Sequence, residues 1–420
     1  MTHPRFLAAV EEIEETDGGR PVYVGIDLRA IAANLSAVED RLDDRTICAV
    51  LKGDAYGHGI EHVLPALVGK CSHYGIVDNC EASAVRAIDA ETPVVRMRVG
   101  SSSEIVGAVK RSLNIREMVA SNDKIDEVGA IAVRHDARID LHVSLNTAAL
   151  GRNGVDVSTF EAIHRLTRTV LRHSNLRLAS VGCHLPDAGS SDPTGVGDPS
   201  REALERFEAT ARSILPIVSD AGAELPELSA YSSASSCAFG SRGLSSGDGV
   251  RRFDRIGSSL FGLTRNSRFR ERTCCQAMHV ATRVCDVVHR NHDDTIGYER
   301  SYRIQAEEGE EIALIGAGWL TLSRYLQGVG KTDRPMLLMS EHGDRHPLVG
   351  RQSMNISTVR GEGHRGKRLR SGDLLYLTTD YEIGAEPPTI ADLATIAGSV
   401  QPEFVSSALG STTSSRKFAF

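Results

Sequence analysis

The sequence has few aromatic residues and no long hydrophobic run. Phe, Trp and Tyr make up 5% of its 420 residues, with a single Trp, and no stretch approaches the roughly 20 apolar residues of a membrane span. The eight cysteines are scattered without a C-x-x-C pair, so neither a disulfide framework nor a cysteine zinc site is predicted. The first 20 residues carry acids where a signal peptide needs an apolar run. We therefore expect a cytoplasmic protein that neither crosses a membrane nor is exported.

A basic surface is lacking as well. The net charge is −7, whereas a nucleic-acid-binding face requires a basic balance, so no nucleic-acid partner is predicted. The composition, 41% hydrophobic and 25% charged, is typical of a globular protein. Because 420 residues exceed the roughly 250–300 at which one core stops growing, two domains are expected.

Residues 22–265 alternate short apolar runs with longer helical patterns. Such alternation indicates a parallel sheet, and the number of units favours an α/β fold of the (β/α)8 TIM-like barrel type. The predicted strands are 22–26, 47–51, 73–77, 93–99, 139–145, 178–185 and 227–229. The predicted helices are 30–41, 60–68, 81–88, 103–109, 157–172 and 201–221.

The pattern changes after residue 265. Strand-like segments separated by glycine or charged turns follow, with little helical periodicity before 389–397. We therefore expect a mostly β C-terminal domain over 266–420. Residues 1–21 are interpreted as an N-terminal extension that could pack on it.

Lys52 is the first candidate for chemistry. It follows the apolar run ICAVL and precedes GDAYGHG, which puts it at the C-terminal mouth of a barrel strand, where such barrels carry their catalytic residues. Lysines in partly desolvated pockets form Schiff bases with aldehyde cofactors. Gly57 and Gly59 would let the backbone approach a phosphate closely. On spacing alone, a solvated lysine in a glycine-rich turn is the simpler interpretation.

The segment LKGDAYGHG resembles the cofactor-lysine signature of the alanine racemase family, K-A-D-A-Y-G-H-G, with Gly53 in place of alanine. The resemblance implies a barrel followed by a β domain, assembled as a head-to-tail homodimer. It implies pyridoxal 5'-phosphate (PLP) as the cofactor, with Lys52 bound to it and Tyr56 in its binding site. Agreement between these implications and the domain pattern favours Lys52 as a functional residue.

A second segment is similar to one branch of this family. LNTAALGRNG (145–154) has the length and form of the N-S-A-G-M-S-R-N-G segment of broad-specificity amino-acid racemases. CEASAVRA (80–87) and PVVRMRVGS (93–101) resemble that branch too. The resemblance implies that Arg152 contacts both the cofactor ring oxygen and the substrate carboxylate, as a bidentate guanidinium can. Without it, a surface arginine in a loop would be favoured.

Three further motifs carry the remaining cofactor contacts that the resemblance implies. VGCHLP places His184 near the cofactor ring, and SAYSSAS places Ser233 at the phosphate. DRIGSSLFG (254–262) sets Arg255 against the pyridine nitrogen, with Gly257 and Ser258 at the phosphate. The departures from the family pattern are Ser232, Ile256 and Phe261.

The C-terminal half contains a candidate for a second catalytic base, in addition to Lys52. TIGYERSY (295–302) resembles V-G-Y-x-R-T-Y, which implies that Tyr298 acts across the dimer interface. VGRQSMNIS (349–357) implies that the backbone N–H of Met354 binds the substrate carboxylate. Racemisation needs bases on both faces of Cα, and Lys52 and Tyr298 form such a pair. We therefore predict an isomerase, a PLP-dependent racemase or epimerase that interconverts free L- and D-amino acids.

Some features depart from the family. GWLTLSR (318–324) replaces the usual G-Y-x-D-G-Y, and VSSALGSTTSSRK (405–417) lacks the phosphate-binding tyrosine. Both indicate an altered substrate, whose identity and cellular role the sequence leaves open. Decarboxylation, aldol cleavage, elimination or non-catalytic PLP binding are the alternatives. His58-Gly-Ile-Glu61-His62 fits a zinc motif, but it overlaps the lysine motif, so no metal is predicted.

Overall fold

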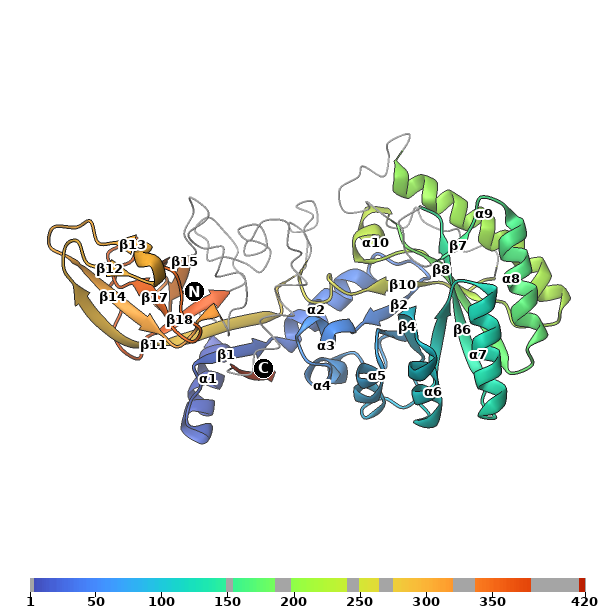
Figure 1. The fold of residues 1–420 in the computed structure, drawn as a ribbon, viewed down its shortest axis with the longest axis horizontal. Helices are drawn as coiled ribbons and strands as arrows, with labels where there is room; N and C mark the ends of the chain where they lie inside the picture. The colour runs from blue at the N-terminus through green and yellow to red at the C-terminus, as the bar shows by residue number, and fades with distance from the viewer. Residues whose placement is uncertain are drawn as a thin grey trace.

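The computed structural model describes residues 4–148, 154–185, 198–239, 249–263, 275–319, 337–378 and 415–419. These residues form one sheet of parallel strands wrapped by helices and a second sheet of mainly antiparallel strands (Figure 1). Across these ranges, no helix combines the length and the apolar character that crossing a membrane requires. The predicted fold class, a (β/α)8 barrel followed by a β domain, is confirmed.

The barrel sheet follows the order β10-β2-β3-β4-β5-β6-β8-β9, and every pair in it is parallel. An isolated parallel bridge from Leu228 to Arg252 brings β9 back to the chain entering β10, so the ring is nearly closed. The strands are β2 (Thr46–Val50), β3 (His73–Ile76), β4 (Val94–Val99), β5 (Ile115–Val119), β6 (Ile139–Asn146), β8 (Leu176–Cys183), β9 (Glu227–Ser229) and β10 (Phe253–Ile256), with β7 (Val155–Asp156) paired to β6.

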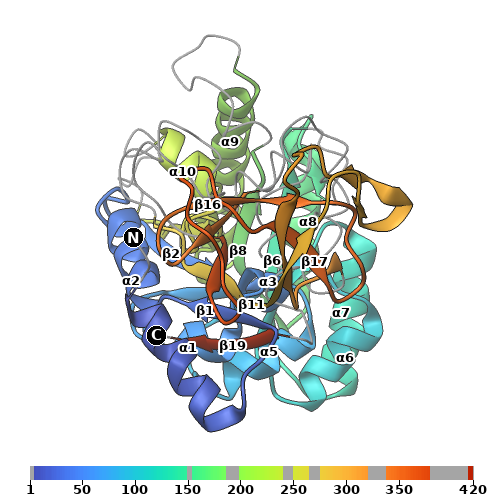
Figure 2. The same cartoon turned by 90° about the vertical axis from the view of Figure 1, so that its left-hand side faces the viewer.

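Helices cover the outside of this ring (Figures 1 and 2). Side-chain caps fix several of their starts, as when Asp78 accepts N–H bonds from Cys80 and Glu81. The longer helices bury an apolar stripe against the strands; that of α8, for example, includes Ile163 and Leu166. The helices are α2 (Leu28–Glu39), α3 (Lys52–Tyr56), α4 (Ile60–Val63), α5 (Asn79–Arg86), α6 (Ser102–Lys110), α7 (Asn122–Arg134), α8 (Phe160–Arg172), α9 (Pro199–Asp220) and α10 (Ser233–Phe239).

The second sheet runs β14-β17-β16-β15-β18-β11-β1-β19. Its longest strand, β11, has a register shift between Val284 and Asp286, and pairs with β18 before the shift and with β14 from Val284 onward. The strands are β1 (Val22–Ile26), β11 (Met278–Arg290), β14 (Glu310–Ile315), β15 (Leu337–Ser340), β16 (Arg345–Val349), β17 (Ser357–Arg360), β18 (Leu374–Thr378) and β19 (Ser415–Ala419), and a separate hairpin contains β12 (Thr295–Ile296) and β13 (Tyr302–Arg303).

The strand at 22–26 corrects one expectation. It was predicted as the first strand of the barrel series, but β1 pairs with β11 and β19 in the β-domain sheet. All five of its residues are buried. A continuous apolar run predicts a strand that is covered on both faces, but it does not indicate which sheet the strand joins.

The N-terminal residues form α1 (Pro4–Asp17), which packs on the β domain. Phe6 and Val10 are fully buried against Tyr376 and its neighbours, and the rings of Phe6 and Tyr376 lie 5.7 Å apart. Glu14 receives two N–H bonds from Arg283 of β11, at 2.8 and 2.6 Å. The helix is therefore an integral layer of this domain.

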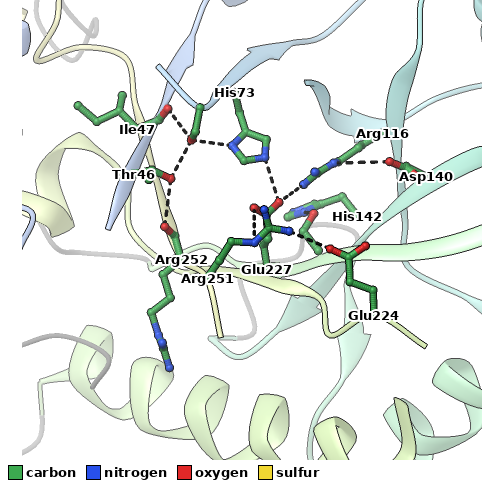
Figure 3. Close-up of polar contacts among 12 residues, drawn as sticks. Thr46, Ile47, His73, Arg116, Asp140, His142, Glu224, Glu227, Arg251 and Arg252 are labelled. Carbon is green, nitrogen blue, oxygen red and sulfur yellow. Dashed lines mark hydrogen bonds and ion pairs between the residues drawn. The ribbon is translucent and has the colours of Figure 1, made fainter. Parts of the chain in front are cut away.

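A buried charged cluster lies at the amino ends of the barrel strands (Figure 3). Glu227 accepts hydrogen bonds from His73, at 3.0 Å, and from Arg116. Burial lowers the pKa of His73 and so favours its neutral form. Burial also acts to raise the pKa of Glu227, but the hydrogen bond from His73 and the charge of Arg116 outweigh it and lower this pKa to about 2. Because the strands are parallel, this cluster occupies the end of the barrel opposite to Lys52.

Candidate functional site

Lys52 lies two residues after the end of β2 and begins an unusual turn. Gly53, Asp54 and Ala55 all adopt left-handed backbone angles, and Tyr56 has a φ of 57°. Such a conformation costs about 1–2 kcal/mol for each residue that is not glycine, so the turn requires external support. The Asp54 carboxylate gives part of it by accepting the N–H of Ile60 at 2.8 Å. Lys52 is exposed at the barrel mouth, where its Nζ lies 5.6 Å from the centre of the Tyr56 ring.

The predicted phosphate residues meet beside this turn. The Ser233 hydroxyl oxygen accepts the N–H groups of Gly257, at 2.9 Å, and Ser259, at 3.3 Å. The Tyr56 hydroxyl is so close that a Cβ on Gly257 would lie 2.2 Å from it. Ser258 is half-buried between these residues. The structure thus brings four predicted cofactor residues together, in a cradle that a larger side chain at 257 would fill.

Arg255 spans the carboxyl ends of three strands. From β10 its Nη1 donates to the backbone oxygen of Ser229 at 2.7 Å and to the Ser229 hydroxyl at 2.6 Å, and its Nη2 donates to the backbone oxygen of Cys183 at 2.5 Å. His184, which is half-buried, follows Cys183 directly. Sequence reasoning did not single out Ser229 or Cys183, although the segments SAYSSAS and VGCHLP contain them. Their position at strand ends was the available signal.

These groups satisfy the chemical needs of PLP. Ser233 accepts two backbone N–H groups and keeps its own hydroxyl hydrogen as a donor for a phosphate oxygen. Lys52 supplies an amine at the same mouth, and Arg255 supplies a fixed cation. The residues present therefore fit the cofactor.

Tyr298 and Met354 both belong to the β domain, where Tyr298 contacts the segment that leads to Met354. Gly297, with a φ of 77°, approaches Arg351 so closely that a Cβ would lie 2.3 Å from the Arg351 nitrogen, and the Tyr298 N–H donates to the Arg351 oxygen at 3.2 Å. Gly318 approaches the Met354 oxygen in the same way, at 2.4 Å from a Cβ. Tyr298 is 60% exposed and Met354 48% exposed. Both predicted residues are therefore exposed on the β domain, and we refer to the two as the half-site.

Within a single chain, this half-site lies far from the lysine turn. Tyr298 lies between β12 and β13, at the end of the β domain farthest from the barrel that carries α3 (Figure 1). Arg152 lies outside the described residues, as do most of the altered entrance segment, 320–324, and the part of the C-terminal segment before β19, 405–414.

Potential metal ligands converge elsewhere. Among the residues that the structure describes, one set of three has ligand atoms within 4.8 Å of one another: Glu341, His342 and Asp373 of the β domain. The zinc-like pattern at 58–62 is not such a set. His58 is instead buried, with its ring stacked on Phe261 at 4.3 Å and its Nδ1 2.9 Å from the Ala55 oxygen.

Comparison with known proteins covers nearly the whole chain. Residues 26–265 match the family model described as alanine racemase, N-terminal domain, and residues 277–415 match the alanine racemase C-terminal domain. A broad specificity amino-acid racemase of Pseudomonas taetrolens is 26% identical over 96% of this chain and 95% of its own length. A lysine racemase of Proteus mirabilis is 23% identical over 80% of this chain and 76% of its own.

Solved structures agree on the fold. The alanine racemase of Clostridium difficile 630 superposes with a TM-score of 0.78 at 18% identity, over 95% of this chain and 96% of that one. The family resemblance of the sequence motifs is confirmed.

Proposed function

The chain belongs to the alanine racemase family, whose members depend on PLP, and we propose that it interconverts free L- and D-amino acids with Lys52 and Tyr298 as its two bases. The gathering of Lys52, Ser233 and Gly257 at one barrel mouth carries this proposal, because an amine and a phosphate cradle are what the cofactor requires. The chain would accordingly be an isomerase, and its substrates free amino acids.

Bound PLP supplies an electron sink that makes the Cα–H of an attached amino acid acidic. The protein then needs a base on each face of Cα, one to remove the proton and one to return it on the opposite side. Lys52 serves one face from the barrel mouth, and Tyr298 serves the other. Substrate orientation falls to Arg152 and to the backbone N–H of Met354, which bind the carboxylate.

Arg255 limits side reactions. Its guanidinium is fixed by Ser229 and Cys183, and an arginine does not give up its proton. Placed against the pyridine nitrogen of PLP, it would keep that nitrogen unprotonated, and the cofactor would then draw electrons more weakly than one paired with a carboxylate. This arrangement favours brief, reversible loss of the Cα proton over transamination.

The two bases come from different chains. Tyr298 and Met354 are exposed on the single chain, and the β12–β13 hairpin that carries Tyr298 lies far from α3 (Figure 1). An exposed half-site that completes the mouth of a second copy makes a symmetric dimer the simplest assembly. We propose a homodimer with two shared sites, in which each β domain supplies Tyr298 and Met354 to the barrel of its partner.

Absorption and chiral analysis test the proposal together. The purified protein should show a band near roughly 420 nm from the lysine-bound cofactor, which Lys52→Ala abolishes. Incubation with a panel of L-amino acids should yield at least one D-enantiomer, and Tyr298→Phe should abolish that product.

Tyr302→Phe is the matched control, because the Tyr302 hydroxyl donates to Glu310 at 2.8 Å and accepts from Arg360 at 2.6 Å within its own chain. It should keep forming D-product. A band without D-product, but with carbon dioxide, aldehyde or keto acid released, would replace racemisation by another Cα reaction. No band after adding PLP would refute the cofactor assignment.

A further inference from the structure

One buried carboxylate holds the lysine turn. Glu81, in the first turn of α5, accepts the N–H of Gly53 at 2.6 Å and that of Asp54 at 3.3 Å through Oε1. Its Oε2 accepts the N–H of Val77, the residue that follows β3, at 2.8 Å. Glu81 is only 8% exposed. A single side chain therefore joins the carboxyl ends of β2 and β3.

The position of these bonds matters more than their number. Gly53 and Asp54 are the first two residues of the left-handed turn, directly after Lys52. The N–H groups that begin a helical turn have no acceptor within it, so they bond to side chains or to water. Glu81 accepts hydrogen bonds from both N–H groups, just after β2, where the backbone conformation determines the direction of the Lys52 side chain.

Glu81 is itself anchored to a rigid frame. The oxygen of Val77 accepts from Nη1 of Arg96 at 3.2 Å. Arg96 is fully buried and makes two bonds to Glu117 of β5, at 2.7 and 3.0 Å. A continuous run of polar contacts thus extends from the lysine turn across β3, β4 and β5. Side chains locked in such a network hold their contacts in one geometry.

We propose that Glu81 is a positioning residue that sets the place of the Lys52 amine for attachment of the cofactor and for proton transfer. The proposal rests on the function proposed above for Lys52. It assigns to Glu81 no contact with substrate or cofactor. Its effect passes through the backbone of Gly53 and Asp54.

Glu81→Gln tests this with little change of shape. A carboxylate offers two accepting oxygens, whereas an amide offers one oxygen and an NH2 group that only donates. In the variant, either the lysine turn or Val77 must therefore face a donor. Asp78→Asn is the matched control, because it removes the same charge three residues earlier on α5. Its remaining oxygen can still cap the N–H groups of Cys80 and Glu81.

The measurement is the rate at which cofactor-free full-length chains capture PLP. Borohydride reduction at timed intervals, followed by peptide mass mapping, reports attachment at Lys52 alone. We expect capture by Glu81→Gln to be slower by about tenfold, the effect of losing one hydrogen bond to a charged acceptor, and Asp78→Asn to match the wild type. Amide hydrogen exchange over 53–57 should speed up in Glu81→Gln only.

The outcomes separate the two proposals. If the wild type captures no PLP at Lys52, the proposed function fails first. If the wild type captures PLP and Glu81→Gln does so at the same rate, Glu81 has no positioning role. Equal slowing in Asp78→Asn would also overturn the proposal, because charge alone would explain it. Should Glu81→Gln not fold, Glu81→Asp, which keeps the charge but withdraws it by one methylene, must show slower capture.

Discussion

Substitution of Gly257 by alanine probes the proposed phosphate cradle most sharply. A Cβ at this position would lie 2.2 Å from the Tyr56 hydroxyl oxygen and 2.8 Å from Cζ of the same ring. Neither the Gly257 backbone nor the Tyr56 ring can move easily to relieve this contact. The Gly257 backbone is bonded to Ser233 at 2.9 Å, and Tyr56 is 7% exposed, lies in the left-handed turn and packs on Phe261 at 5.3 Å between ring centres.

Overpacking of a tight interior costs about 1–3 kcal/mol. Because both partners are fixed, we expect Gly257→Ala to lose about 2–3 kcal/mol of unfolding free energy, the upper part of that range. Tyr56→Phe removes the atom at 2.2 Å but leaves Cζ at 2.8 Å. The double variant should therefore recover part of the loss, and the two substitutions should not be additive.

Urea denaturation of the cofactor-free chains gives the four free energies of this cycle, and PLP titration gives the accompanying affinities. Gly107→Ala in α6 is the control, because its Cβ would meet only the ends of two side chains, Nδ2 of Asn79 at 3.2 Å and Nη2 of Arg111 at 3.9 Å, and alanine favours a helix. A Gly257→Ala chain as stable as the wild type, or a strictly additive cycle, would refute the close contact between Tyr56 and Gly257.

Three further substitutions test other parts of the structure. Glu227→Gln removes the nearer of the two carboxylates that the buried Arg116 contacts, with Asp140 remaining at 3.9 Å, and should cost up to about 3–5 kcal/mol at neutral pH. The pKa values of His73 and Glu227 are lowered in the fold, so their contributions to stability are complete above pH 6.5 and pH 4.5, respectively, and are lost as the pH falls. Urea titrations from pH 8 to 4 should therefore show a falling free energy of unfolding. A rise would contradict the stabilising role of the cluster. Phe6→Ala should lose up to about 3–5 kcal/mol, less if α1 detaches locally, which proteolysis of the first 17 residues would reveal. Arg255→Lys keeps the charge but cannot reach acceptors on two strands, so PLP should bind about tenfold more weakly in an absorbance titration; unchanged affinity would show that these bonds do not support the site.

Much of the barrel could be predicted from periodicity, and the two strands that were missed show its limit. β5 and β10, with the sequences IREMV and FDRI, carry charged residues that point to buried partners or to the site. Arg116 in β5 bonds to Glu227, and Arg255 in β10 spans the mouth. Apolar periodicity fails where a barrel interior is charged, because the compensating residue lies on a distant strand.

The candidate site divides in the same way. Motifs located Lys52, Ser233 and Gly257, which the structure brings together at one mouth. The segments CEASAVRA and SAYSSAS contain Glu81 and Ser229 but did not reveal their roles, because the groups that they bond, the N–H of Gly53 and the guanidinium of Arg255, lie far away in the sequence. Such contacts depend on the tertiary structure, so they can be identified only when the arrangement of the strands is known.

Mixing two inactive variants is the most direct test of the shared two-base site. Lys52→Ala chains keep Tyr298, and Tyr298→Phe chains keep Lys52, so each mixed dimer contains one complete site. Random reassociation of equal amounts makes half the dimers mixed, and D-amino acid formation should recover to about one quarter of the wild-type rate. A mixture that stays as inactive as its parents would contradict the claim that the two bases come from different chains.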